Sequence, residues 1–237
     1  MYAAASGMAA QQMQLEIVAD NLANADVAGF KGDAATFEDV RAGTIGLGTT
    51  SVGKHAVFAQ GKLMRSGGPF DVAIDGPGFF VVERGRERAY TRNGEFARDA
   101  GGTLRNAAGW TLSAVRIPAD ALAVRVERDG RVLVDTAGAH GRTIARLRLA
   151  SFATPEALRP LGATLFAATE TSGRARLFAP GGRDGSSIAF GMLERSNVSI
   201  VEAMMQILGA QRAYEANAKG VQAADEMLRI ANNLHRG

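Results

Sequence analysis

Several stretches of the 237-residue chain contain residue types that could do chemistry, and the first is rich in glycine. Residues 48–55 read Gly-Thr-Thr-Ser-Val-Gly-Lys-His, one residue short of a phosphate-binding loop, because His55 stands where a hydroxyl would hold magnesium. Such a loop must follow a buried strand and open a helix, whereas residues 55–59 alternate as a strand does. The sequence therefore predicts a plain Gly-rich loop here, not a nucleotide site.

Metal and nucleophile chemistry has little support. The three histidines, His55, His140 and His235, are far apart in sequence, so none stands at a metal-ligand spacing from another. Cysteine is absent, which removes disulfides, thiolate nucleophiles and cysteine metal sites. No Gly-x-Ser-x-Gly elbow occurs. We expect no catalytic residue, no metal and no cofactor, and thus no enzyme.

Asp71 and Asp75 are the remaining acid–base candidates, because a glycoside hydrolase needs two carboxylates. They flank Val-Ala-Ile, and residues 75–78 read Asp-Gly-Pro-Gly, which is typical of a turn. A structural role is favoured. Asn197-Val198-Ser199 matches a glycosylation acceptor, but the same residues serve a helix cap.

The N-terminal segment is predicted to be a helix that ends at Gly29. Apolar residues recur every seven positions, with a second set three residues after each, which is the spacing of a coiled-coil seam. The first set is Met1, Met8, Leu15 and Leu22, and the second is Ala4, Gln11, Val18 and Ala25.

The C-terminal segment carries a longer stripe of the same kind, capped by Ser196 or Asn197. Its two sets are Ile200, Ile207, Tyr214, Val221 and Leu228, and Ala203, Ala210, Asn217, Ala224 and Ala231. A helix from Val198 to Leu234 would be about 55 Å long at 1.5 Å per residue. Because its apolar seam is narrow, this helix needs helical partners, and we expect an antiparallel pair with the N-terminal helix.

The middle of the chain is predicted to be strands, which makes the fold α+β with antiparallel sheets, a barrel or a sandwich. The turn Asp129-Gly130 between two valine-rich runs is a strong hairpin signal, and residues 96–105 repeat it more loosely. Further strands are expected at residues 79–83, 110–115, 144–152 and 188–193.

Charge is distributed unevenly along the chain, although its net value is only +3. Residues 1–40 carry a balance of minus five, and residues 83–148 carry plus five. This asymmetry favours attraction between subunits. A nucleic-acid reader would cluster its cations, so we expect no nucleic-acid partner. No apolar run approaches the roughly 20 residues needed to span a bilayer, and the first ten residues lack a cleavable secretory signal.

Four motifs, in order along the chain, closely resemble signatures of the bacterial flagellar rod and hook family. They are Asp-Asn-Leu-Ala-Asn-Ala at 20–25 followed by Gly-Phe-Lys at 29–31, Asp-Val-Ala-Ile-Asp-Gly-Pro-Gly-Phe-Phe at 71–80, Tyr-Thr-Arg-Asn-Gly-Glu-Phe at 90–96, and Glu-Arg-Ser-Asn-Val at 194–198 leading into Gln-Arg-Ala-Tyr-Glu-Ala-Asn at 211–217. Residues 140–190 match only loosely. Taken singly, Asn21 and Asn24 could simply cap or bridge.

The resemblance implies a structural subunit of the flagellar basal-body rod that assembles with other rod and hook axial proteins into a multi-subunit helical structure. It also implies periplasmic location, export through the flagellar type III apparatus without a cleaved signal peptide, and no direct membrane insertion. The expected division is an N-terminal helix at 1–30 paired with 196–237 as the inner tube, a linking region at 31–80 plus 176–195, and an outer β domain at 81–175. The expected assembly residues are Met8, Leu15, Asn21, Leu22, Asn24, Phe30, Asn197, Ile200, Ile207, Tyr214, Val221 and Leu228.

Within this family, the short stretch of forty residues between Phe30 and Asp71 favours the proximal (FlgF) type over the distal rod or another hook-basal-body type. Two other classes of protein have little support in the sequence. A secreted glycan-binding β domain needs an exposed aromatic platform, and the chain has one Trp and three Tyr. A peptidoglycan hydrolase needs paired carboxylates in a cleft, for which no candidate stands out.

Overall fold

The computed structural model describes residues 2–42, 45–162, 164–182 and 185–234, which pack into two compact units. The first, here the helical unit, comprises Met1–Ala25, Asp33–Val57 and Val198–Gly237. The second, the β-rich unit, comprises Asp26–Gly32 and Phe58–Asn197. The predicted α+β class is confirmed, while the three-part division stays a prediction. Neither helix combines the length and apolar character needed to cross a membrane, within the residues searched.

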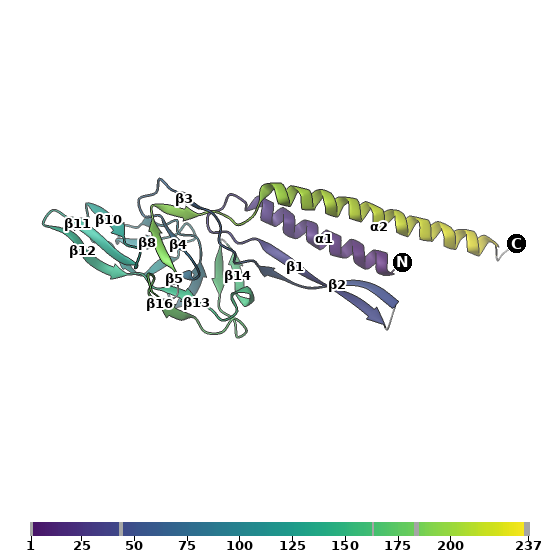
Figure 1. Cartoon of the computed structure of the whole chain (residues 1–237), viewed down its shortest axis with the longest axis horizontal. Coiled ribbons are helices and arrows are strands. Elements are labelled where there is room, and N and C mark those ends of the chain that lie inside the picture. The colour runs from purple at the N-terminus through teal and green to yellow at the C-terminus, as the bar shows by residue number, and fades with distance from the viewer. Residues whose placement is uncertain (1, 43–44, 163, 183–184, 235–237) are drawn as a thin grey trace. The chain divides into compact units, whose positions relative to one another are not determined.

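In the described residues, the helical unit consists of helices α1 (Tyr2–Ala23) and α2 (Ile200–Leu234) and the hairpin of β1 (Asp33–Ala42) and β2 (Ile45–Ala56) (Figure 1). Helices α1 and α2 run antiparallel and side by side, and strands β1 and β2 lie along α1. A methyl group on Gly7 would lie 3.2 Å from the side-chain nitrogen of Asn217, so the helices approach closely there. Ile17 and Val18 are both buried, since α1 is covered by α2 and by the hairpin.

The ends of both helices differ from the prediction. Helix α1 ends at Ala23, six residues before Gly29, because the Asn24 side chain donates to the Asp20 carbonyl oxygen at 2.8 Å and occupies a terminal acceptor. Helix α2 begins at Ile200, and its cap is Ser199, whose hydroxyl oxygen accepts from the Glu202 backbone N–H at 3.4 Å. Gly29 and Asn197 do not cap the helices; both lie in the β-rich unit.

The β-rich unit is built on one nine-stranded sheet and three smaller sheets. The large sheet has the order β14-β15-β6-β5-β9-β8-β7, with β13 pairing both β5 and β16. Its strands are β5 (Phe79–Arg84), β6 (Glu87–Thr91), β7 (Ala97–Arg98), β8 (Thr103–Arg105), β9 (Thr111–Arg116), β13 (Leu149–Ser151), β14 (Arg159–Gly162), β15 (Leu165–Ala167) and β16 (Arg176–Phe178). The smaller sheets are β10 (Ala123–Val126), β11 (Arg131–Thr136) and β12 (Ala139–Arg146); β4 (Val72–Asp75) with β17 (Ser187–Phe190); and β3 (Leu63–Arg65) with β18 (Met192–Glu194).

Both predicted hairpins are confirmed, and two predicted strands are each divided. Val126 pairs with Val132 across the Asp129-Gly130 turn, and Ala97 pairs with Arg105 across the other turn. The expected strand at 144–152 is split between β12 and β13. The one at 188–193 is split at Gly191, whose φ of 71° turns the chain from β17 to β18.

The core of the β-rich unit lies between its sheets. Buried apolar side chains from the large sheet pack against Val132, Leu147 and Ile188. Beside them, Phe58, Phe79, Phe152, Phe166 and Tyr90 form a chain of edge-to-face aromatic contacts, with ring centroids 4.7–6.4 Å apart. Phe58 and Phe152 are thereby packed against the large sheet, to which Phe79, Tyr90 and Phe166 belong.

Candidate assembly site

The residues first considered for catalysis take structural positions. Residues 48–55 belong to β2, so the predicted Gly-rich loop is wrong, and a strand paired antiparallel with β1 replaces it. Asp71 is buried and accepts a hydrogen bond from the Ser66 hydroxyl, whereas Asp75 is exposed at the end of β4. His140 lies 3.9 Å from an Asp135 oxygen at the surface, and His235 lies outside the described residues.

The predicted assembly residues of the helices share one unit. Met8, Leu15, Leu22, Ile207 and Val221 are half-buried, while Ile200 and Tyr214 are about two-fifths exposed. The more deeply buried positions of α2 are Ala203 and Ala210, which belong to the second set of the stripe. The Leu228 side chain lies outside the described residues.

Asn21, in the first motif, joins two elements of the helical unit. The Asn21 side chain donates to the Asp33 carbonyl oxygen and accepts from the Asp33 backbone N–H, both at 2.8 Å, and so joins α1 to β1. Lys54 on β2 adds ion pairs to Asp33 at 2.9 Å and to Asp20 at 3.4 Å. Partial burial is the largest single influence and opposes the charge of Lys54, but the hydrogen bonds and negative charges of Asp33 and Asp20 together outweigh it and raise the Lys54 pKa above its ordinary value.

Phe30 and Asn197, the other two predicted residues, lie in the β-rich unit beside a buried ion cluster that sequence reasoning missed. The Asn197 side chain accepts from the Gly32 backbone N–H at 2.8 Å and donates to the Ala59 carbonyl oxygen at 3.2 Å. Phe30 is half-buried in the segment that leads to Lys31. The Asn197 side chain thus links Gly32 to Ala59.

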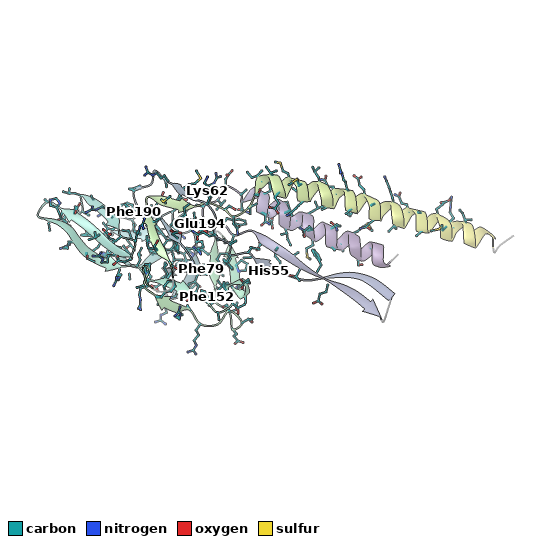
Figure 2. All side chains as sticks on the ribbon, viewed as in Figure 1. His55, Lys62, Phe79, Phe152, Phe190 and Glu194 are labelled. Atoms are coloured by element: carbon teal, nitrogen blue, oxygen red, sulfur yellow. The ribbon has the colours of Figure 1, made fainter. Side chains whose placement is uncertain are left out.

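The ion cluster is centred on Glu194, the last residue of β18, which Figure 2 shows among the strands of the β-rich unit. One carboxylate oxygen accepts from Lys31 Nζ at 2.6 Å and from the Gly61 backbone N–H at 2.9 Å. The other lies 3.3 Å from an Arg92 nitrogen. The side chains of Lys31 and Glu194 are fully buried, and that of Arg92 is nearly so.

Backbone carbonyls complete the coordination of the two cations. Lys31 Nζ donates to the Ala59 carbonyl oxygen at 2.7 Å, and Arg92 donates to the Gly76 carbonyl oxygen at 2.8 Å. Burial lowers the pKa of Lys31 and Arg92 below their ordinary values, and the negative charge of Glu194 opposes that shift. Glu194 thus supplies the negative charge that offsets the cost of burying the charges of Lys31 and Arg92. Arg92 Nε is buried without a hydrogen-bond partner among the described residues.

Close backbone approaches surround this cluster and require glycine. Gly29 has a φ of 67°, and a methyl group there would lie 2.3 Å from the Asn93 backbone nitrogen. A methyl group on Gly61 would lie 1.9 Å from the Arg195 carbonyl oxygen. The motifs at 29–31, 90–96 and 194–198 therefore meet at one place through charge and through close backbone packing.

We expect Gly61→Ala to lower the free energy of unfolding by about 1–3 kcal/mol or more, because the added methyl group must push backbone apart. Gly67→Ala is the matched control, since a methyl group there meets no atom within 4 Å and the residue has no left-handed φ. Urea unfolding followed by circular dichroism measures both. Equal midpoints for the two variants would show that the approach at Gly61 carries no strain.

The exposed apolar surface of the helical unit is concentrated on α2. Val201, Met204, Met205 and Leu208 are each more than half exposed and follow the spacing i, i+3, i+4, i+7. At 100° per residue these four, here called the outer stripe, lie on the side of α2 opposite to Ala203 and Ala210. The described residues of the helical unit leave the outer stripe uncovered. Exposed apolar stripes of this kind mark interaction surfaces.

Three segments of the chain match models of known protein families. Residues 1–31 match the family model "Flagella basal body rod protein", residues 73–134 match "Flagellar hook protein FlgE/F/G D1 domain", and residues 190–234 match "Flagellar basal body rod FlgEFG protein C-terminal". The flagellar basal-body rod protein FlgG of Borreliella burgdorferi is 35% identical, over 100% of this chain and 98% of its own length. The chain belongs to the flagellar basal-body rod FlgE/F/G family.

Other relatives in the family carry two names. The FlgG protein of Caulobacter vibrioides is 33% identical over 98% of this chain and 97% of its own length. The FlgF protein of Mesorhizobium japonicum is 30% identical over 92% of this chain and 90% of its own length. The expected family is confirmed, and it is a family of rod structural proteins, not of enzymes. The narrower expectation of the FlgF type is not confirmed.

The three residues of the ion cluster, which the sequence analysis did not single out, lie within the motifs that resemble the family. Lys31, Arg92 and Glu194 each stand inside a quoted motif, next to the asparagines and aromatics that drew attention. Each of these motifs also holds a second charged residue, Asp20, Glu95 or Arg195, so the sequence alone did not single out the two cations and one anion of the cluster.

Proposed function

We propose that this chain is a structural subunit of the flagellar basal-body rod that assembles with other axial subunits through its terminal helices. The observation that carries the proposal is the outer stripe, which remains exposed after α1 has paired with α2. Burying one such side chain in an assembly stabilises it by about 1.5–3 kcal/mol. Repeated in every subunit, four such side chains provide a substantial driving force for assembly.

In this proposal the helical unit contributes to the inner tube, with α1 and α2 forming a coiled-coil seam, and the β-rich unit forms the outer part of the rod. The twelve predicted assembly residues act in two ways. Those on the helices shape the pair that other subunits meet. Asn21 joins α1 to β1, Asn24 bonds at the end of α1, and Asn197 fixes the segments beside the ion cluster, where Phe30 also lies. The flagellar export apparatus is the further partner that this role implies.

Among rod types we propose the distal, FlgG type. Its support is that the relatives named FlgG match the chain at up to 35% identity over up to its full length, against 30% over 92% for the relative named FlgF. The proximal, FlgF type is the second candidate, favoured by the short stretch between Phe30 and Asp71, which here holds β1, β2 and β3.

A charge in the outer stripe should test the assembly proposal. We expect Leu208→Asp to abolish polymer formation by the purified chain, because a carboxylate cannot enter an apolar interface unpaired, while the circular dichroism spectrum stays unchanged. Gln206→Asp is the matched control, since Gln206 is exposed on α2 but lies outside the outer stripe. Polymers are measured by sedimentation and electron microscopy. Polymers of normal length from Leu208→Asp would contradict the proposal.

A further inference from the structure

Three arginine side chains, Arg98, Arg116 and Arg142, line one open cavity of about 530 Å³ in the β-rich unit. The remaining walls carry no charge. They consist of Ala100, Gly101, Gly102, Ile117, Pro118, Ala119 and Ile144. A cavity with three guanidinium groups and no carboxylate in its lining is a site of concentrated positive potential.

Two of the three guanidinium groups donate to neutral acceptors. Arg98 donates to the Pro118 carbonyl oxygen and Arg116 donates to the Gly101 carbonyl oxygen, each at 3.0 Å. Each therefore keeps further N–H groups free for another acceptor. Within the described part of the chain, none of the three arginines forms an ion pair. Elsewhere in the same unit Arg84 and Arg88 pair with Glu87 and Glu83.

The acid nearest in sequence is already engaged. One oxygen of Asp99 accepts from the Thr103 backbone N–H at 2.8 Å, and the other lies 3.3 Å from an Arg105 nitrogen. Asp99 thus belongs to the turn between β7 and β8 and leaves the three arginines uncompensated. Planar guanidinium groups bind carboxylates in paired, bidentate hydrogen bonds, so a carboxylate is a fitting ligand for this cavity.

A source of carboxylates exists in the chain itself. The β-rich unit carries twenty-one cations against fifteen acids, whereas the helical unit carries six cations against nine acids. Glu16, Glu202 and Glu215 of the helical unit are exposed and form no ion pair among the described residues. The two units therefore carry opposite net charge. The β-rich unit has arginines, and the helical unit has glutamates, that form no ion pair in the described residues.

We propose that the cavity lined by Arg98, Arg116 and Arg142 binds acidic side chains from the helical unit of a second copy of this chain. This inference rests on the proposed assembly of the chain with copies of its own kind. It adds a specific contact: the outer stripe supplies apolar burial, and the three-arginine cavity supplies charge pairing that fixes how successive copies meet.

Charge reversal with a matched control tests the contact. We expect Arg142→Glu to weaken self-association of the full chain, measured by sedimentation velocity, by about tenfold or more. The Arg142 side chain forms no hydrogen bond or ion pair with the described residues, and its backbone pairing in β12 does not depend on the side chain, so the replacement should leave the β-rich unit folded. Arg174→Glu makes the same change of charge at an exposed position outside the cavity and should weaken association less than about threefold. Sodium phosphate should weaken wild-type association more than sodium chloride of equal ionic strength.

A charge swap identifies the source of the carboxylate. Mixed with Arg142→Glu, one of the variants Glu16→Arg, Glu202→Arg or Glu215→Arg should restore association. Normal association of Arg142→Glu would overturn the cavity contact while leaving the rod proposal intact. Weakened association that no swap restores would overturn the second copy as the ligand source. A wild-type chain that stays monomeric in all conditions would overturn the rod proposal and this inference with it.

Discussion

Glu194→Ala is expected to lower the free energy of unfolding of the β-rich unit by about 3–5 kcal/mol, because it leaves buried cations without a counter-charge. Lys31 and Arg92 both point their charges at this carboxylate, at 2.6 Å and 3.3 Å. The Gly61 backbone N–H also loses its acceptor. Since burial already lowers the pKa of Lys31, removing the opposing charge favours release of its proton. Urea unfolding, followed by circular dichroism, measures the decrease in the free energy of unfolding.

Two variants separate charge from general disturbance. Glu170→Ala removes an exposed carboxylate from the same unit and should change stability by less than about 0.5 kcal/mol. Glu194→Gln keeps a carbonyl acceptor but no charge. Its loss of unfolding free energy should therefore lie between those of Glu194→Ala and Glu170→Ala. If Glu194→Ala and Glu170→Ala unfold at the same urea concentration, the cluster does not stabilise the fold.

The elements that the sequence predicted well are those with local signals. The stripe from Ile200 to Leu228 repeats every seven residues, and the Asp129-Gly130 turn needs no information beyond its own six or so neighbours. Both signals predict the local fold without reference to distant parts of the chain. The alternation at residues 55–59 was a local signal as well, but only residues 55 and 56 lie in a strand, and that strand extends back to Ile45 through residues that glycine composition had assigned to a loop.

The ion cluster could not be predicted in the same way, because its members are 163 and 102 residues apart. Nothing near Lys31 in sequence says that Glu194 will accept from it. Gly29 was misread for a related reason. A glycine after a helix usually supplies its last turn, but here its left-handed φ serves an approach to Arg92 and Asn93 that only the folded unit creates.

The outer stripe was missed because Val201, Met204, Met205 and Leu208 fall between the positions of the seven-residue repeat. A search for one seven-residue repeat follows a single face of the helix, so it does not detect a second apolar face on the same helix. The structure separates the two faces by burial: Ala203 and Ala210 are covered, and the four residues of the outer stripe are not. Membership of the family came from motif resemblance, which periodicity alone could not supply.

Val18→Asp should disrupt the helical unit and abolish assembly while leaving the β-rich unit folded. Val18 is only 2% exposed, in a helix covered by α2 and the hairpin, so a carboxylate there is buried without a partner. The cost is about 3–5 kcal/mol. A helix of 22 residues with little intrinsic stability cannot absorb that cost, because its order depends on packing. We expect a weaker circular dichroism signal at 222 nm and no polymers.

Ala19→Asp provides the matched control, since Ala19 is the adjacent residue on α1 and is exposed. It introduces the same charge into the same helix at an exposed position, so a larger effect of Val18→Asp points to the burial of position 18. Limited proteolysis locates the damage: Val18→Asp should be cut within α1 and α2, leaving a resistant fragment of the β-rich unit. Normal polymers from Val18→Asp would mean that pairing of the terminal helices is not what other subunits recognise. The outer stripe would then have to act on α2 alone, without α1 beneath it.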